Sequence, residues 1–142
     1  MTYAMRQLMH DVAAFHRATG QPVLTEPQIP PGRLELRIDL LKEEFDETIE
    51  AMRSADLVET ADGLADLIYV AIGAALEFGI PLDLVWAEVQ RSNMAKIDKE
   101  TGKVLYHMSG KVAKPEGWAP PDIAGVLYDG QHRGEVSQEE FR

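Results

Sequence analysis

The sequence predicts an all-α fold, a four-helix-type bundle that ends in a short β-hairpin and an extended tail. Apolar residues recur at steps of three and four in four segments, which is the pattern of amphipathic helices. The connections between the last three of these segments are short, and the pattern changes after Asp98. The 142 residues are enough for a single domain with its own core, spanning 1–142.

The first two predicted helices cover residues 3–18 and about 33–55. Gly20 ends the first, and four prolines between residues 21 and 32 make the connection a loop. The apolar residues expected on one face of the first helix are Met5, Leu8, Met9, Val12 and Phe15. Those expected on one face of the second are Leu34, Ile38, Leu41, Phe45, Ile49 and Met52.

The third and fourth helices are predicted at about 57–78 and 82–97. Gly79 ends the third helix, and Pro81 opens the fourth. The core residues expected in the fourth are Leu84, Val85, Val89 and Met94. Because their connections are short, the second, third and fourth helices are expected to be antiparallel neighbours.

The chain after residue 100 is predicted to be non-helical. Residues 101–106 and 109–112 are expected to form the two arms of a hairpin, because each reads as a short strand. The proline-rich segment 115–123, with Trp118 in it, is expected to be rigid and extended. The polar residues from 131 onward are expected to fray.

The composition narrows the classes of partner. Twenty-four acidic and 14 basic residues give a net charge of −10, which disfavours nucleic-acid polymers and anionic membranes as partners. A small polyanion is still possible when divalent cations bridge it to the protein. The chain has no cysteine, and its longest uncharged apolar run, 67–76, is too short to cross a bilayer. We therefore expect a cytoplasmic protein.

The second predicted helix carries an unusual group of acids. Glu43, Glu47 and Glu50 fall within a narrow sector of the helical wheel, with Glu44 at its edge. Lys42 is the only nearby cation in this run, so helical neighbours do not pair these carboxylates. For a single helix, a solvated acidic face is the simpler interpretation.

The third predicted helix adds Glu59, Asp62 and Asp66 along one stripe. Asp66 precedes the apolar stretch 67–76 and is therefore expected to be buried. It is either a core aspartate with a backbone or arginine partner, or part of an oxygen-rich site between two helices that suits Mg²⁺ or Mn²⁺. None of the four histidines follows a glutamate by three residues, which argues against a di-iron bundle.

The fourth predicted helix ends in a polar and basic turn. Arg91, Ser92, Asn93 and Lys96 carry groups that suit phosphate and a nucleoside. The alternative is that these cations only balance the helix macrodipole. Both interpretations are open at this point.

Three segments together resemble a known superfamily. Glu43-Glu44-x-x-Glu47, residues 62–70 and residues 91–96 are similar to the all-α nucleoside triphosphate pyrophosphohydrolases. That superfamily includes MazG proteins, dimeric dUTPases and phosphoribosyl-ATP pyrophosphohydrolases. The similarity covers about 33–100 and is closest to the MazG-like or phosphoribosyl-ATP pyrophosphohydrolase-like branch, with the hairpin and tail at about 101–142.

The resemblance departs from the family pattern at one point. The pattern is Glu-x-x-Glu on one helix and Glu-x-x-Asp on the next, and Glu44 with Glu47 matches the first half. If Asp66 ends the second half, Gly63 stands where a glutamate is expected. The other register, Glu59-x-x-Asp62, leaves Asp66 unused, and the hydrophobic context favours Asp66.

The resemblance implies Mg²⁺-dependent (or Mn²⁺-dependent) hydrolysis of a nucleoside triphosphate to a monophosphate and pyrophosphate. It implies homodimers or homotetramers of helical bundles. The residues it implies as metal ligands are Glu44, Glu47, Asp62 and Asp66, with Glu59 as the alternative. The residues it implies for catalysis are Glu43, as the base, and Glu47; those for substrate binding are Arg91, Asn93 and Lys96.

Three functions are consistent with these features of the sequence. The first is a house-cleaning enzyme that hydrolyses dUTP or a non-canonical nucleotide. The second is a phosphoribosyl-ATP pyrophosphohydrolase of histidine biosynthesis. The third is a non-enzymatic helical interaction module that binds metal only for its structure.

Overall fold

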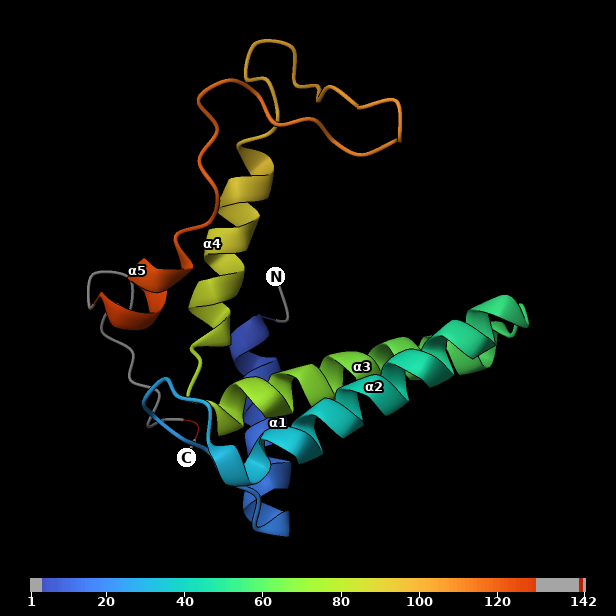
Figure 1. Ribbon diagram of the computed structural model, residues 1–142, viewed down its shortest axis with the longest axis vertical. Helices are drawn as coiled ribbons and strands as arrows, with labels where there is room; N and C mark the ends of the chain where they lie inside the picture. The colour runs from blue at the N-terminus through green and yellow to red at the C-terminus, as the bar shows by residue number, and fades with distance from the viewer. Residues whose placement is uncertain (1–3, 130–140, 142) are drawn as a thin grey trace. The chain divides into compact units, whose positions relative to one another are not determined.

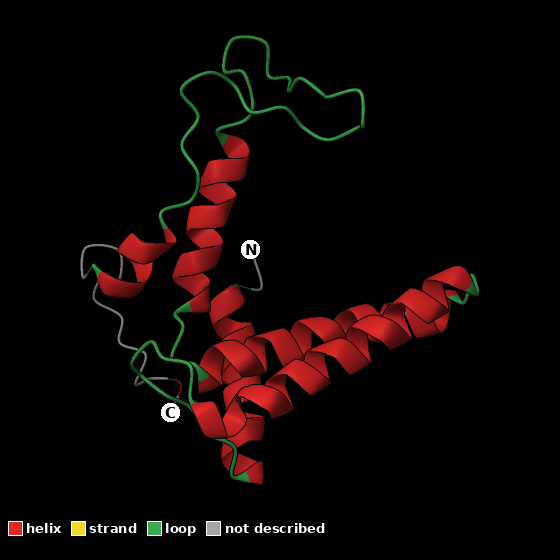
Figure 2. Ribbon diagram, in the orientation of Figure 1, coloured by secondary structure: helices red, strands yellow, loops and turns green. Residues whose placement is uncertain are grey.

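The structure, a computed structural model, describes residues 4–129 and residue 141 (Figure 1). Within these residues it is helical and contains no strand (Figure 2), so the all-α prediction is confirmed. The helices are α1 (Met5–Thr19), α2 (Pro31–Arg53), α3 (Leu57–Glu77), α4 (Leu82–Met94) and α5 (Ile123–Tyr128). The short α5 was not predicted, and the four-helix bundle stays a prediction.

Local sequence signals explain where the first helices begin and end. Gly20 caps α1 in the left-handed conformation, with φ of 73°, and its N–H donates to the carbonyl oxygen of His16. Helix α2 starts at Pro31, two residues earlier than expected, because proline suits the first position of a helix. Asp56 caps α3 by accepting from the Glu59 N–H at 3.1 Å.

Helices α2 and α3 form a long antiparallel pair joined by a tight turn (Figure 1). Gly63 allows the two helices to approach closely, since a Cβ there would lie 2.5 Å from Thr48 Oγ1 and 3.1 Å from Thr48 Cα. In the turn, Ala55 adopts φ of 54°, a left-handed conformation that is costly for a residue with a Cβ. The pair is the frame on which the predicted acidic residues are arranged.

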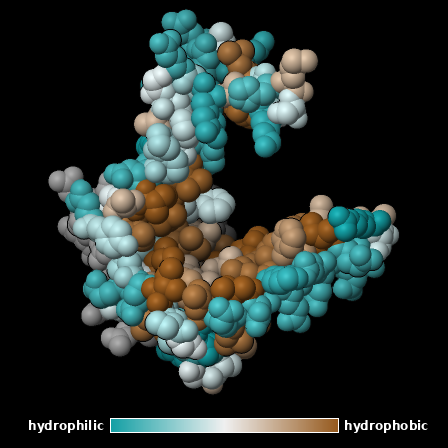
Figure 3. Space-filling view, viewed as in Figure 1, coloured by the Kyte–Doolittle hydropathy of each residue, from teal (hydrophilic) through white to brown (hydrophobic). Residues whose placement is uncertain are grey.

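The hydrophobic core lies between α1 and the C-terminal half of α3. Its buried residues are Met9, Val12, Ala13, Ile72, Leu76 and Phe141. Helix α1 leaves the N-terminal half of α3 uncovered, so Ile68 is 53% exposed and Leu57 is 81% exposed. Figure 3 shows hydrophobic side chains gathered along one side of the helix pair.

Parts of the apolar faces of two predicted helices are exposed. Ile38, Phe45 and Met52, expected on one apolar face of the second helix, are exposed, and the buried residues of α2 are Arg37, Thr48 and Ala51. Val89 and Met94, placed in the core of the fourth helix, are exposed as well. The apolar periodicity identified the helices correctly, but within the described residues nothing covers these parts of their apolar faces.

The chain divides into two compact units. The first holds α1, α2 and α3; the second holds α4 from Asp83 onward, the segment after it, and α5. One domain can comprise two such units, so the single domain over 1–142 stays a prediction. Of the expected hairpin, only the antiparallel bridge between Tyr106 and Val112 is formed in the described residues. The frayed tail from residue 131 lies outside them, apart from Phe141.

Helix α5 begins where an extended segment was expected to end. Asp122 caps it by accepting from the Gly125 N–H at 2.9 Å, and with six residues it is too short to show helical periodicity in the sequence. No single described helix has the length and hydropathy of a membrane span, although α3 and α4 pass that test together as a bent pair.

Candidate metal and nucleotide site

Glu44 is the centre of a group of carboxylates from both α2 and α3. Its side chain is half-buried, and its Oε2 atom is buried without a hydrogen-bond partner in the described part of the chain. Burial raises the pKa of Glu44, and the charges of Asp66, Glu47, Glu43 and Asp62 raise it further. Carboxylates of both helices therefore act on Glu44, and the five residues are called the acidic cluster hereafter.

Among the described residues, no cation forms an ion pair with the acidic cluster. Lys42, the one cation expected nearby, forms its ion pair with Asp46 at 2.6 Å on the exposed surface of α2. This hydrogen bond raises the pKa of Lys42. No ion pair to a member of the acidic cluster is formed within residues 4–129. Unpaired like charges that are partly buried favour a cation from outside the chain.

Gly63 explains why the family pattern is shifted in α3. A glutamate at position 63 would bring its Cβ to 2.5 Å from Thr48 Oγ1 and 3.1 Å from Thr48 Cα, so it does not fit there without a shift of Thr48. The acids stand at the neighbouring positions Asp62 and Asp66, and both act on the pKa of Glu44. Glu59 lies exposed in the first turn of α3 and is not among the charges that shift the pKa of Glu44.

Asp66 is half-buried rather than buried. The apolar stretch that follows it was expected to be enclosed on all sides, but Ile68 and Tyr69 are exposed, and continuous burial starts only at Ile72. The reason is that α1 packs on the C-terminal half of α3 alone. No group of three or more acidic or histidine side chains in the described residues is close enough to hold a metal ion, so the ligand set stays a prediction.

The opposite end of the helix pair holds a carboxylate of another kind. Glu77 is fully buried, and both of its oxygens are paired: Oε1 with Arg33 Nε at 2.5 Å and Oε2 with Arg37 Nη1 at 2.7 Å. Hydrogen bonding to Glu77 raises the pKa of Arg33, whereas burial lowers that of Arg37. Gly73 makes room for this buried ion-pair network, since a Cβ there would overlap the Arg37 guanidinium.

This network was not predicted from the sequence. Its partners are 44 residues apart in the chain, so no local pattern connects them. The available signals were a glutamate at the end of an apolar stretch and two arginines at i and i+4 on the preceding helix.

A cavity of about 210 Å³ lies beside the network, one helical turn from the acidic cluster. Leu40 precedes Glu44 by one turn, and Val70 follows Asp66 by one turn. The lining residues are Phe15, His16, Gln21, Arg37, Leu40, Tyr69 and Val70. The rings of Phe15 and Tyr69 meet edge-to-face with centroids 6.0 Å apart. Burial lowers the pKa of His16, which keeps it neutral near pH 7, with its Nδ1–H donating to the Pro22 carbonyl at 3.0 Å.

The predicted substrate-binding residues are Arg91 and Asn93 in α4 and Lys96 just after it; they lie in the second unit and contact one another or their neighbours. Arg91 pairs with Glu88 at 2.9 Å, which raises the pKa of Arg91, and it also reaches the carbonyl oxygen of Pro120 at 3.4 Å. Lys96 donates to Asn93 Oδ1 at 2.9 Å. The role of Arg91, Asn93 and Lys96 in substrate binding stays a prediction.

Comparison with known proteins tests the resemblance stated above. "Uncharacterized protein L479" of Acanthamoeba polyphaga mimivirus is 38% identical over 77 residues, a region that makes up 51% of this chain and 31% of the viral protein. The aligned region thus spans about a third of that relative's length. The family model "Phosphoribosyl-ATP pyrophosphohydrolase" matches residues 12–93, more than half of the chain, including the whole acidic cluster. The chain therefore belongs to the phosphoribosyl-ATP pyrophosphohydrolase family, a family of hydrolases that act on phosphoric anhydrides.

Proposed function

We propose that the chain hydrolyses a nucleoside triphosphate, such as dUTP or a non-canonical nucleotide, to the monophosphate and pyrophosphate with Mg²⁺ or Mn²⁺. The observation that carries this proposal is the buried Oε2 atom of Glu44, which has no hydrogen-bond partner among the described residues. Four other carboxylates act on the same group, and no cation of the described chain pairs with them. Family membership supports the reaction class.

The donor set suits a hard divalent cation. Carboxylate oxygens are the ligands that Mg²⁺ and Mn²⁺ prefer, and the ligands proposed here are Glu44, Glu47, Asp62 and Asp66. When bound, the ion supplies charge neutralisation for phosphate oxygens and activation of water. Its binding also removes the repulsion among the carboxylates, which is the physical reason for the protein to retain it.

Glu43 and Glu47 are the catalytic residues of the proposal. Glu43 adjoins Glu44 on α2 and is exposed, so its carboxylate is open to a water molecule at the edge of the acidic cluster. It accepts a proton from the water that attacks phosphorus. Glu47 lies one turn further along α2 and combines metal binding with orientation of that water.

The cavity of about 210 Å³ supplies a place for the nucleoside. The ring of Tyr69 offers a stacking surface, and Gln21 offers an amide. Arg37 also lines the cavity, and its buried Nε–H has no acceptor among the described residues. A carbonyl oxygen or ring nitrogen of a base would satisfy that donor. Arg91, Asn93 and Lys96 lie in the second unit and stay predicted substrate-binding residues.

Phosphoribosyl-ATP is the second candidate substrate, and the family match favours it directly. The two substrates share the same chemistry at phosphorus, so the acidic cluster serves either. A non-enzymatic metal-binding module is the third alternative, and it differs from both in predicting metal binding without turnover.

A nucleotide panel with pyrophosphate detection tests the proposal. The purified chain is incubated with dUTP, the canonical and several non-canonical triphosphates, and phosphoribosyl-ATP, each with Mg²⁺, Mn²⁺ or a chelator. Pyrophosphate release that needs the metal is expected with at least one substrate, and the preferred one decides between the first two candidates. Metal-linked stability without turnover on any of them would establish the third.

Two substitutions on α2 connect the activity to the acidic cluster. Glu47→Gln is expected to abolish pyrophosphate release, because it removes a catalytic carboxylate. Glu35→Gln makes the same chemical change at an exposed position outside the cluster and is expected to leave activity unchanged. Retained activity in the first variant, or equal loss in both, would exclude the proposed site.

We also propose that the chain is a cytoplasmic homodimer or homotetramer. The apolar stripe of α3 that α1 leaves uncovered supports this, since Leu57, Leu64 and Ile68 are all exposed along it. Light scattering on the purified chain measures the mass directly, and Ile68→Glu is expected to dissociate the oligomer. A monomeric wild-type chain would contradict this part of the proposal.

A further inference from the structure

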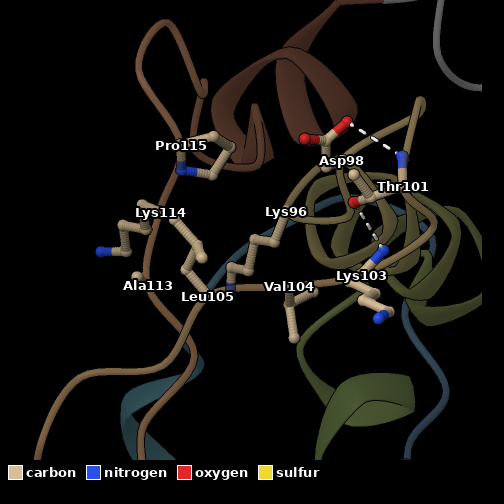
Figure 4. Close-up of a pocket in the computed structure, with 9 residues that line it drawn as sticks. All are labelled: Lys96, Asp98, Thr101, Lys103, Val104, Leu105, Ala113, Lys114 and Pro115. Carbon is tan, nitrogen blue, oxygen red and sulfur yellow. Dashed lines mark hydrogen bonds between the residues drawn. The ribbon is translucent and has the colours of Figure 1, made fainter.

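A second cavity lies wholly within the second unit, in the segment that follows α4. Its volume is about 410 Å³, which is in the range of small-molecule sites. The lining residues, drawn in Figure 4, are Lys96, Asp98, Thr101, Lys103, Val104, Leu105, Ala113, Lys114 and Pro115. We refer to this cavity as the lysine pocket.

Backbone hydrogen bonds hold the walls of the lysine pocket in place. The Asp98 N–H donates to the Lys103 carbonyl at 2.8 Å, and the Gly102 N–H donates to the Asp98 carbonyl at 2.7 Å. Gly102 makes this tight loop possible with φ of 66°. Across the pocket, the Ala113 N–H donates to the Leu105 carbonyl at 2.7 Å. The pocket is thus built from ordered backbone on both sides.

Three lysines line the lysine pocket together with apolar side chains such as Val104 and Leu105. Figure 4 shows Lys96 between Lys103 on one side and Lys114 on the other, with Val104 and Leu105 close by. None of the three ammonium groups forms an ion pair with a carboxylate in the described residues. Like charges around one cavity repel each other, and apolar lining side chains weaken solvent screening, so an anion in the pocket would relieve this repulsion.

Two of the three lysines also contact Trp118, which is not a lining residue, and Lys96 donates to Asn93 Oδ1 at 2.9 Å. The ammonium groups of Lys96 and Lys114 lie over the ring of Trp118, at 5.4 and 5.0 Å from its centroid. Trp118 is itself fixed, because its Nε1–H donates to the Ser92 carbonyl at 2.7 Å. The pocket's one acid, Asp98, accepts from the backbone N–H of Glu100 at 2.8 Å with Oδ1, which ties it to the loop.

The charge of this segment is opposite to that of the chain. Residues 91–114 contain six lysines and arginines but two acids, a net charge of +4, within a chain of net charge −10. The remaining residues therefore carry −14. This concentration of cations in one short segment favours an anionic ligand there.

We propose that the lysine pocket binds the diphosphate part of a phosphorylated ligand without a divalent metal. Three lysines and one acid leave a lining charge of +2, which a pyrophosphate group matches better than a single carboxylate does. The ligand is either inorganic pyrophosphate or a nucleoside di- or triphosphate, because both carry this group. The inference does not depend on the acidic cluster, which requires a metal.

Calorimetric titration in the presence of a chelator tests the proposal. The chelator removes divalent ions, so binding through the acidic cluster and hydrolysis are both suppressed. Inorganic pyrophosphate and ATP are the two probes, with AMP as the single-phosphate comparison. Pyrophosphate and ATP are expected to bind and AMP to bind more weakly; the tighter of the first two identifies the source of the diphosphate.

Charge-neutral variants locate the binding. Lys103→Gln and Lys114→Gln are each expected to weaken binding by about tenfold, the effect of losing one charged contact. Lys111→Gln removes the same charge from an exposed position of the same segment that does not line the pocket, and it is expected to bind as the wild type does. Circular dichroism confirms that each variant is folded.

Two results would overturn the inference. One is the absence of metal-free binding of both pyrophosphate and ATP to the wild-type chain. The other is an equal loss of affinity in Lys111→Gln, which would reflect the charge of the segment and not the pocket. Loss of pyrophosphate release from a nucleotide in an acidic-cluster variant affects neither result, so the two proposals fail separately.

Discussion

Glu77 and Glu44 are carboxylates of the same helix pair with opposite surroundings. Glu77 is fully buried, and two arginines of the chain pair with both of its oxygens. Glu44 is half-buried among four other carboxylates, and its Oε2 atom has no partner in the described residues. Burying either glutamate without a cation would be costly, and of the two only Glu77 is paired with arginines of the described chain.

This difference distinguishes a structural carboxylate, Glu77, from Glu44, which is proposed to be functional. A chain that needs a buried acid only for its fold supplies the cations itself, as Arg33 and Arg37 do for Glu77. A group of acids left without cations has unused capacity for a positive ligand. Removing the charge of Glu77 should therefore lower the stability of the fold, and removing the charge of Glu44 should lower the activity.

The largest expected effect is on stability, in Glu77→Gln. The substitution leaves Arg37 buried without its anionic partner, and breaking such a pair costs about 3–5 kcal/mol. Urea denaturation should show a free energy of unfolding reduced by that amount, or a chain that no longer folds. Glu35→Gln, which is exposed on α2, serves as the control and should unfold as the wild type does. A loss below about 1 kcal/mol in Glu77→Gln would mean that the network is not structural.

Glu44→Gln should show the reverse pattern. It removes one of the mutually repelling charges, so the free energy of unfolding should stay the same or rise. Loss of a proposed metal ligand should lower kcat/KM by at least about 100-fold, since even outer-shell partners of a metal contribute 10–100-fold. Mg²⁺ should raise the melting temperature of the wild type and raise that of the variant less. A stable, fully active variant would remove the distinction between the two glutamates.

A smaller effect on stability is expected from a substitution at Gly63, where α2 and α3 approach closely. Gly63→Ala places a methyl group 2.5 Å from Thr48 Oγ1, which itself donates to the Glu44 carbonyl at 2.6 Å. Overpacking of this kind costs about 1–3 kcal/mol, and it should also lower activity by displacing Glu44. Gly32→Ala, where a Cβ meets nothing within 4 Å, is the matched control and should not destabilise the chain. Equal effects of both substitutions would show that the close approach at Gly63 is unimportant.

The helices and the acidic residues were predictable because both depend on local spacing. Periodicity located α1 to α4 to within three residues at each end, and the steps of three and four placed Glu44 and Asp66 on faces that act on each other. Gly63 also stood out in the sequence as a departure from the family pattern, although only the structure shows that Thr48 occupies the space.

Burial and long-range pairing were not predictable in the same way. A helical pattern shows that a face is apolar but not what covers it, which is why Val89 and Ile68 were expected inside and are exposed. The Glu77 network joins residues 44 positions apart, and such partners become visible only when the helices are placed side by side. Local spacing therefore predicts the acidic cluster of α2 and α3 more readily than the ion pairs of Glu77.

The pH dependence of stability should also distinguish Glu44. Burial and neighbouring carboxylates raise the pKa of Glu44 in the folded state, so the folded chain binds this proton more tightly than the unfolded chain does. The resulting stabilisation is present below the unfolded-state pKa and is lost as the pH rises through the raised folded-state pKa. Denaturation at several pH values should show Glu44→Gln more stable than the wild type at neutral pH, with the difference shrinking in acid. A constant difference would show that the pKa is not shifted.

The smallest expected effect is a gain in stability at the turn that joins the two helices. Ala55 has φ of 54°, a conformation that costs a residue with a Cβ about 1–2 kcal/mol, whereas glycine adopts it freely. Glycine costs about 0.5–1 kcal/mol more backbone entropy on folding, so Ala55→Gly should gain roughly 0.5–1 kcal/mol. Ala14→Gly, at an exposed position within α1, carries the entropy cost without the relief and should lose a similar amount. The melting temperature should therefore rise in the first variant and fall in the second, while pyrophosphate release stays at the wild-type rate in both.

A lower melting temperature in both variants would mean that the backbone of Ala55 is not strained in the turn. Changed activity in Ala55→Gly would mean that the geometry of the acidic end depends on this turn as well as on the contact between Gly63 and Thr48.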